Sequence, residues 1–277
     1  MDAYGMDAYD GEGPTPFRLA EGAPGSPVLL HVPHSARAVP APVRERILLD
    51  DARLNAELDR MTDSHTALLA ERAAAGTGAW RFVNGLSRLV VDPERFPDER
   101  EEMRAVGMGA VYTRTSRLTP LREDDAEHER ALLDAYFHPY AAAMTDAVQD
   151  RLEAAGRVVV IDVHSYPSVP LPYELHGDGP RPPVCLGTDA FHTPPWLSAA
   201  AREAFAGCGE VGLDSPFSGA YVPLKHYRTT PKVSALMVEI RRDVYMDEPG
   251  GAPHSGLDRV AGALAALIGI IEAAPVG

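Results

Sequence analysis

Lysine, cysteine and long apolar runs are scarce in this 277-residue sequence, and each scarcity argues against a class of protein. Lys225 and Lys232 are the only lysines, which argues against a Schiff-base lysine and leaves most positive charge to arginine, whose planar guanidinium recognises carboxylates. Cys185 and Cys208 are the only cysteines, too few for a disulfide framework or a zinc knuckle. This usage favours a reducing, cytoplasmic location.

No stretch of the sequence is long enough to predict a membrane span. Residues 260–271 are uncharged, but they cover about half the length that a span needs, and their helical apolar spacing predicts a docked amphipathic helix. The N-terminus has no signal-peptide pattern. The net charge of −14 argues against nucleic acid and anionic membranes as partners. A small-molecule substrate is therefore expected, and the oligomeric state stays open.

Several common catalytic motifs are also missing. The sequence contains no HExxH, no P-loop and no GxSxG nucleophile elbow. The segment GCGEVG at 207–212 matches GxGxxG, but it follows a predicted helix instead of a strand, so it is interpreted as a turn. Any metal ligands must therefore come from scattered positions.

Apolar strands alternate with amphipathic helices along the chain, which predicts a mixed, mostly parallel sheet covered on both faces. Residues 1–14 are acidic, Gly-rich and predicted to be disordered, and residues 15–277 are predicted to form a single domain. The excursion at 96–122 is charged and irregular, and could form a lid. Strands are predicted at 28–30, 79–84, 88–92, 157–165, 183–189 and 234–243, and helices at 51–75, 125–155 (interrupted at Pro139), 195–206 and the C-terminus.

Two histidines follow or end buried strands, and both are candidate metal ligands. His34 ends HVPH and His164 ends IDVH; imidazole is a common zinc ligand, and hydrolytic zinc takes three protein ligands. Asp63, placed on the predicted helix 51–75, is the preferred third ligand, with His65 and His31 as rivals. Asp162 lies two residues before His164 on the same strand face, where it could orient a ligand.

Charged side chains near other strand ends are candidates for catalysis and substrate binding. Glu239 interrupts an apolar strand, where burial is costly unless the carboxylate is paired or used as a general base. A salt bridge with Arg241 is the alternative. Cationic side chains flanking the strand ends or following FSGAYV could bind a substrate carboxylate: Arg88, Arg95, Arg241, Arg242, Lys225 and His226.

The ordered set of motifs resembles the N-formylglutamate amidohydrolases, the N-formylglutamate deformylases of histidine degradation. The matching segments cover most of residues 27–250 and are HVPHSA (31–36), MTD (61–63), SRLVVDPER (87–95), FHPY (137–140), IDVHSY (161–166), PPVCLGTD (182–189), FSGAYV (217–222), KHY (225–227) and MVEIRRDVYMDE (237–248). The resemblance implies a three-layer α/β/α fold like that of zinc-dependent exopeptidases.

The resemblance also implies roles for individual residues. His34 and His164 become metal ligands and Glu239 the catalytic carboxylate. Arg88 and Arg95 fall in the family's SRxxxDxNR-like segment, where Pro93 and Glu94 replace the usual Leu-Asn. The HxxE spacing of the exopeptidases is absent, because Arg37 stands where the glutamate would be.

The sequence thus predicts a metal-dependent amidohydrolase. His34, Asp63 and His164 would bind zinc or another divalent ion, Glu239 would be the general base, and Arg88, Arg95, His226 and Arg241 would bind substrate. The expected reaction converts an N-formyl or N-acyl acidic amino acid, such as N-formyl-L-glutamate, to formate and the amino acid. The alternatives are a hydrolase of another N-acyl amino acid or small peptide, a metal-free hydrolase, and a non-catalytic binding protein of the same fold.

Overall fold

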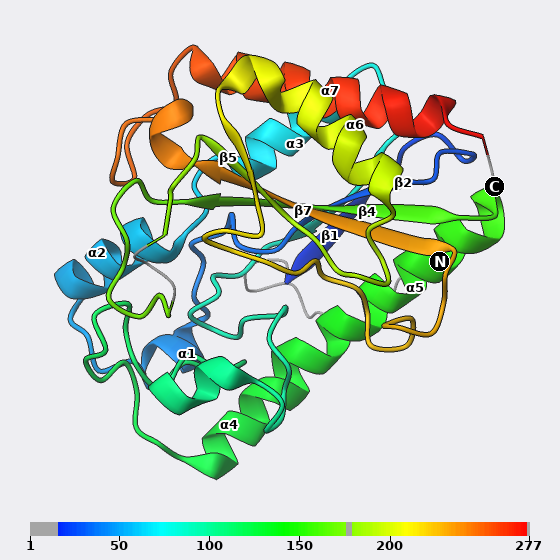
Figure 1. Ribbon diagram of the computed structural model, residues 1–277. Helices are drawn as coiled ribbons and strands as arrows, with labels where there is room; N and C mark the ends of the chain where they lie inside the picture. Colours follow the sequence, from blue (N-terminus) through cyan, green and yellow to red (C-terminus); the bar gives the residue numbers. More distant parts are fainter. Residues whose placement is uncertain (1–15, 176–178, 276–277) are drawn as a thin grey trace.

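A seven-stranded mixed sheet forms the centre of the structure (Figure 1). The structure, a computed structural model, describes residues 16–175 and 179–275, so the segment 1–14 lies outside the described residues. The strand order is β1-β3-β2-β4-β7-β5-β6. The strands are β1 (Phe17–Ala20), β2 (Val28–Val32), β3 (Trp80–Asn84), β4 (Val158–Tyr166), β5 (Val184–Gly187), β6 (Val211–Leu213) and β7 (Val233–Arg241).

The four central strands, β3, β2, β4 and β7, run parallel to one another. β1 and β5 are antiparallel to their central neighbours, and β6 is parallel to β5. All nine residues of β4 are buried, as expected of a strand covered on both faces. The parallel arrangement brings the carboxyl ends of β2, β4 and β7 to one edge of the sheet, where ligands bind in open α/β sheets.

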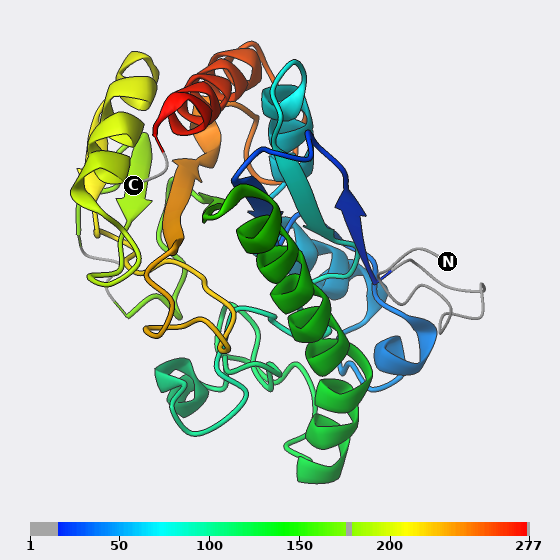
Figure 2. The same cartoon turned by 90° about the vertical axis from the view of Figure 1, so that its right-hand side faces the viewer.

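Helices cover both faces of this sheet. In Figure 1, α3 (Thr66–Ala74), α6 (Pro195–Phe205) and α7 (Gly256–Ala273) lie above it, and their apolar residues share one core with Leu30 and Ile161. α5 (His138–Ala155) crosses the opposite face, seen along its length in Figure 2, and packs on Leu29 and Val160. Alternate residues of β2 and β4 thus face different layers. The predicted three-layer α/β/α fold is confirmed.

The predicted C-terminal helix is α7, and it docks on the sheet and on its neighbouring helices. Its apolar positions Val260, Leu264, Leu267 and Ile271 are fully buried, which confirms the expected amphipathic helix. No helix in the described ranges is long and apolar enough to cross a membrane.

The predicted helix 51–75 is in fact two helices, α2 (Asp51–Met61) and α3, so placing Asp63 on a helix was wrong. Thr62 adopts an extended backbone with ψ 133°, and His65 has a positive φ of 66°. The break is stabilised by the amide of Asp63, which donates to the carbonyl of His34, and by the hydroxyl of Thr66, which donates to the carbonyl of Asp63. These bonds fix Asp63 beside the end of β2.

Residues 88–92 were predicted to form a strand, and this was wrong: they form a turn followed by irregular chain. Leu89, Val90 and Val91 are all buried, but they divide between two apolar clusters beside the sheet instead of facing a ladder partner. The amide of Asp92 donates to the carbonyl of Ala110. A run of apolar residues can therefore be buried by packing without joining a sheet.

A further set of helical segments precedes α5, lies within the excursion 96–122, or follows α6 and β7. α5 begins at His138, with Pro139 in its first turn, after a π-helical turn (Leu133–Phe137) that follows α4 (Ala126–Leu132), so the predicted interruption near Pro139 is confirmed. The excursion 96–122 carries the short helix η2 (Glu102–Val106). The other short segments are α1 (Ala41–Arg44), η4 (Ala206–Cys208), which leads through residues 209–210 into β6, and η5 (Arg242–Val244).

Replacing Arg122 by methionine is expected to stabilise the protein by about 1–3 kcal/mol at pH 7–8. Arg122 is 2% exposed, two of its nitrogens have no partner, and no acid in the described ranges forms an ion pair with it. Burial lowers its pKa to about 10. The charged form is therefore disfavoured on folding below pH 10, and this penalty fades as the pH rises from 10 towards 12.5.

Denaturant unfolding from pH 7 to pH 10.5 measures this effect. The advantage of Arg122→Met over the wild type should shrink as the pH rises. Arg117→Met, at an exposed site on the same excursion, is the control and should change stability by about 0.5 kcal/mol or less. An Arg122→Met variant less stable than the wild type throughout would show that the guanidinium contributes more than its burial costs.

Candidate active site

A cavity of about 890 Å³ contains the carboxyl ends of β4 and β7 and the residues that follow β2. Six predicted site residues line it: His34, Asp63, Arg88, Arg95, His164 and Glu239. Phe96, Arg100, Glu101, Glu102 and Met103 of the 96–122 excursion line it too. Segments far apart in the sequence thus meet at the edge expected from the strand pattern.

His34, His164 and Asp63 bring three potential ligand atoms close together. His34 Nδ1 lies 3.3 Å from His164 Nδ1, and Asp63 Oδ2 lies 3.1 Å from His164 Nδ1 and 3.7 Å from His34 Nδ1. A tetrahedral ion with ligand distances of about 2.0–2.1 Å holds its ligand atoms about 3.4 Å apart. The three atoms therefore have the chemistry and the spacing of a tetrahedral metal site.

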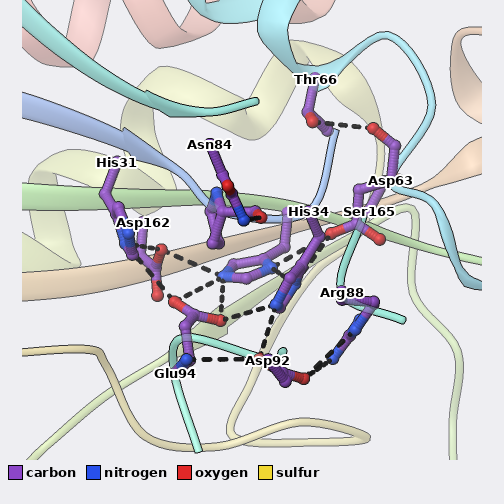
Figure 3. Close-up of polar contacts among 12 residues, drawn as sticks. His31, His34, Asp63, Thr66, Asn84, Arg88, Asp92, Glu94, Asp162 and Ser165 are labelled. Atoms are coloured by element: carbon purple, nitrogen blue, oxygen red, sulfur yellow. Dashed lines mark hydrogen bonds and ion pairs between the residues drawn. The ribbon is translucent and has the colours of Figure 1, made fainter. Parts of the chain in front are cut away.

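The opposite nitrogens of the two imidazoles are held by other carboxylates. His34 Nε2 lies 2.9 Å from Asp92 Oδ1 (Figure 3). His164 Nε2 lies 3.1 Å from Asp162 Oδ1. A carboxylate on the second ring nitrogen fixes the tautomer of a metal-binding histidine and orients its ring. The predicted contact between Asp162 and His164 is confirmed.

Neighbouring charges keep two of these buried carboxylates ionised. Burial alone would raise the pKa of Asp63, but His164 and His34 lower it overall, and Arg242 donates to Asp63 Oδ1 at 3.2 Å. Burial also opposes ionisation of Asp92, whose pKa is nevertheless held well below its usual range by Arg88 and His34. Both groups are therefore available as anions at neutral pH.

Glu94 provides a second carboxylate on the far side of the histidine pair. Its Oε2 lies 3.2 Å from His164 Nε2 and 3.7 Å from His34 Nε2. Besides the set with Asp63, two residue sets in the described ranges that include Glu94 have donor atoms close enough to hold a metal ion: His34, Glu94 and His164, and His31, Glu94 and Asp162. The geometry thus offers Glu94 as an alternative to Asp63 beside the histidines.

Glu239 lies opposite His164 in the register of β4 and β7. Its side chain is buried, and Oε2 has no hydrogen-bond partner. Burial raises the pKa of Glu239 to about 8, with Asp63 adding to the rise and His164 opposing it. The alternative, a salt bridge with Arg241, does not form, because Arg241 pairs with Asp243 instead. In its ionised form, an unpartnered carboxylate at a cavity wall with this raised pKa is suited to accept a proton.

Arg88 and Arg95 reach the same cavity from the segment after β3. Arg88 donates to Asp92 Oδ2 at 2.7 Å and to the hydroxyl of Tyr112 at 2.9 Å. Arg95 is held more loosely, 3.4 Å from Glu101 Oε1 and 3.7 Å from Asp92 Oδ2, and its side chain is 27% exposed. Arg95 is therefore the more available of the two guanidiniums for a ligand.

Two predicted substrate-binding residues are not among the residues that line the cavity. β7 ends at Arg241, whose side chain donates to Asp243 and to the carbonyl of Arg181. His226 Nδ1 lies 3.2 Å from the hydroxyl of Thr230, whereas its neighbours Lys225 and Tyr227 line the cavity. These placements correct the expected substrate contacts of Arg241 and His226.

Arg242 takes the position that was expected for Arg241. The chain turns into η5 at this residue, which directs its guanidinium towards Asp63 and Ser165. The rival ligand His65 lies apart from the cluster, with Nε2 2.9 Å from the carbonyl of Gly251. The other rival ligand, His31, contacts Asp162 and Glu94 instead of Asp63.

Asp92 and Tyr112 are site residues that the sequence analysis did not single out. Asp92 contacts both His34 and Arg88, and the hydroxyl of Tyr112 donates to it. Two sequence signals pointed to Asp92: it ends an apolar run, which resembles an ordinary strand end, and it is the aspartate of the SRxxxDxNR-like segment. Tyr112 stands in the irregular excursion, where no periodicity indicates which side chains face inward.

Similarity to known proteins agrees with this architecture. The sequence profile of the N-formylglutamate amidohydrolases matches residues 26–246. The structure resembles N-formylglutamate amidohydrolase from Ralstonia eutropha, with a TM-score of 0.78 and 22% identity over 93% of this chain and 97% of that one. It also resembles a gene product from Agrobacterium tumefaciens, with a TM-score of 0.70 and 20% identity over 93% of this chain and 94% of that one. No curated protein matches the sequence.

The profile match spans strands β2 to β7, the histidine pair, Asp63 and Glu239, and so includes the whole candidate site. The resemblance seen in the ordered motifs is thereby confirmed. The chain belongs to the N-formylglutamate amidohydrolase family and is a hydrolase that acts on an amide C–N bond.

Proposed function

We propose that this enzyme removes the formyl group from an N-formyl acidic amino acid such as N-formyl-L-glutamate, giving formate and the free amino acid, with a bound divalent ion, zinc in the first instance. The observation that carries the proposal is the set of His34 Nδ1, His164 Nδ1 and Asp63 Oδ2 in one cavity with the unpartnered Oε2 of Glu239. Two nitrogen donors and one oxygen donor suit zinc.

His34, His164 and Asp63 would hold the ion and leave a position for substrate or water, as catalytic zinc sites do. Asp92 and Asp162 would keep each imidazole in the tautomer that presents Nδ1 to the ion. When bound, the ion supplies a Lewis acid for the formyl carbonyl and lowers the pKa of water.

Glu239 would move the proton in this reaction. Its free carboxylate oxygen accepts a proton from the attacking water and passes it to the leaving amide nitrogen. Oε2 of Glu239 is buried and has no hydrogen-bond partner, so no structural hydrogen bond competes with the proton for this oxygen.

The guanidiniums would divide two further tasks. Arg88, held by Asp92 and Tyr112, would donate to the oxyanion that develops on the carbonyl. Arg95, loosely paired and partly exposed, would bind a substrate carboxylate. In this assignment Arg241 and His226 have no contact with substrate.

The size of the cavity favours a second candidate substrate. About 890 Å³ lies near the top of the range of about 300–1,000 Å³ for drug-sized ligands. A longer N-acyl amino acid or a small peptide would also fit such a space.

Release of a free amino acid would belong to amino-acid catabolism, histidine degradation included. The two free, buried cysteines agree with a cytoplasmic location.

Formate release from N-formyl-L-glutamate tests the proposal directly. Turnover should be lost on chelation and return with added zinc, and zinc should be present in the purified protein. N-acetyl-L-glutamate and a formylated dipeptide, assayed in parallel, separate the two substrate classes. Full turnover by metal-free protein would eliminate the metal-dependent mechanism, and turnover of the acetyl or peptide substrate alone would replace the formyl substrate.

A further inference from the structure

Glu94 and Asp162 lie beside the proposed metal ligands but are not needed to hold the first ion. Glu94 Oε1 lies 3.5 Å from His31 Nδ1, and Asp162 Oδ1 lies 2.9 Å from the same nitrogen (Figure 3). Glu94 and Asp162 line the cavity, and His31 is fully buried behind them. These three residues therefore form a separate donor cluster that is reached from the same space.

In the described ranges, the imidazole N–H groups that face Glu94 and Asp162 are fewer than the carboxylate oxygens of these two residues. With its Nδ1 facing the proposed metal, neutral His164 has one N–H, at Nε2, which lies 3.1 Å from Asp162 and 3.2 Å from Glu94. The Nε2–H of His34 is taken by Asp92 at 2.9 Å. The Nδ1–H of His31 is the one other ring donor that faces the pair. Two N–H groups thus serve the four oxygens of two carboxylates.

The charges leave the same deficit. Of the nearby guanidiniums, Arg88 pairs with Asp92 and Arg242 pairs with Asp63. No arginine or lysine within residues 16–175 and 179–275 forms an ion pair with Glu94 or Asp162. Asp162 is buried and Glu94 is half-buried, and adjacent carboxylates largely removed from water are costly without a cation. A positive charge beside Glu94 and Asp162 would relieve both the charge and the missing donors.

We propose that His31 Nδ1, Glu94 and Asp162 form a second divalent-metal site next to the one held by His34, Asp63 and His164. Binding through Nδ1 leaves the Nε2–H of His31 to donate to the hydroxyl oxygen of Tyr140, 2.6 Å away, which is the supporting contact that a metal-binding imidazole needs. Asp162 touches both His31 and His164 and so links the two sites. The inference rests on the proposed function, because it takes the first ion to be held through the Nδ1 atoms.

Metal stoichiometry tests the second site without relying on turnover. Full-length protein is stripped with chelator and titrated with Zn²⁺ by calorimetry, with elemental analysis after gel filtration. The wild type should bind two equivalents per chain. Glu94→Gln should keep the first equivalent within about threefold of its wild-type affinity and weaken the second at least tenfold. Glu102→Gln, an exposed glutamate that lines the same cavity, should bind like the wild type.

The outcomes separate this proposal from the proposed function. One equivalent in the wild type overturns the second site and leaves the single-metal hydrolase intact, whereas no bound metal overturns both. Two unchanged equivalents in Glu94→Gln also overturn the assignment. Asp162→Asn should lower the second affinity and, because Asp162 also orients His164, weaken the first by about 10- to 100-fold, with little change in the far-ultraviolet circular dichroism spectrum.

Discussion

Glu239→Gln should lower kcat for deformylation by about 100- to 10,000-fold while the bound metal stays at its wild-type level. Glutamine matches the shape of glutamate but cannot accept the proton from water. Because Oε2 of Glu239 has no hydrogen-bond partner, no protein contact of that oxygen is lost. The substitution also removes a buried carboxyl group whose ionisation is opposed by burial, so the melting temperature should stay the same or rise slightly.

Glu102→Gln is the matched control, since it makes the same chemical change at an exposed position of the same cavity. Its kcat should stay within about twofold of the wild type, as for surface changes that remove no special contact. Metal content, KM and kcat are measured for all three proteins. Wild-type turnover by Glu239→Gln would eliminate Glu239 as the base, whereas loss of metal from this variant would assign it to binding the ion.

The sequence was most informative where a single strand decides the position of a side chain. β2, β4 and β7 are apolar runs that end in polar residues, and parallel strands bring such ends together. His164 and Glu239 were therefore predictable as neighbours, and the register pairs them directly. The period of two along β4 also predicted that Asp162 would contact His164.

The sequence was least informative where tertiary contacts set the backbone. The position of Asp63 depends on the break between α2 and α3, which is fixed by a hydrogen bond to His34, 29 residues earlier. The buried run before Asp92 has the composition of a strand and is packed as a turn. Arg242 replaces Arg241 at the site because the alternation of β7 ends where η5 begins. None of these three features follows from local propensity or periodicity.

Asp63→Asn should weaken binding of the first metal ion by at least about 100-fold, more than the loss of a residue that only orients a ligand, which costs about 10- to 100-fold. Asp63 Oδ2 is the oxygen nearest the two Nδ1 atoms, and asparagine offers there a neutral amide with weaker donor strength. Asp92→Asn, which weakens the support of His34 Nε2 and the ion pair with Arg88 but leaves the Nδ1 atoms and Asp63 in place, should fall within the smaller range. Asp146→Asn, at an exposed position of the cavity wall, should have no effect.

Arg242 complicates the interpretation of this variant, because it loses its anionic partner when Asp63 is replaced. Removing one partner of a buried ion pair costs about 3–5 kcal/mol, so the variants must be compared under conditions in which unfolding measurements show each to be folded.

The decisive comparison is with Glu94→Gln, since Glu94 faces the Nε2 atoms of the same histidines. If Asp63→Asn keeps the tight equivalent and Glu94→Gln loses it, the ion binds on the Nε2 side and Glu94 is the third ligand. If Asp63→Asn loses the tightly bound ion and Glu94→Gln keeps it, Asp63 is the third ligand. The unpartnered Oε2 of Glu239 then lies in the same cavity as this ion.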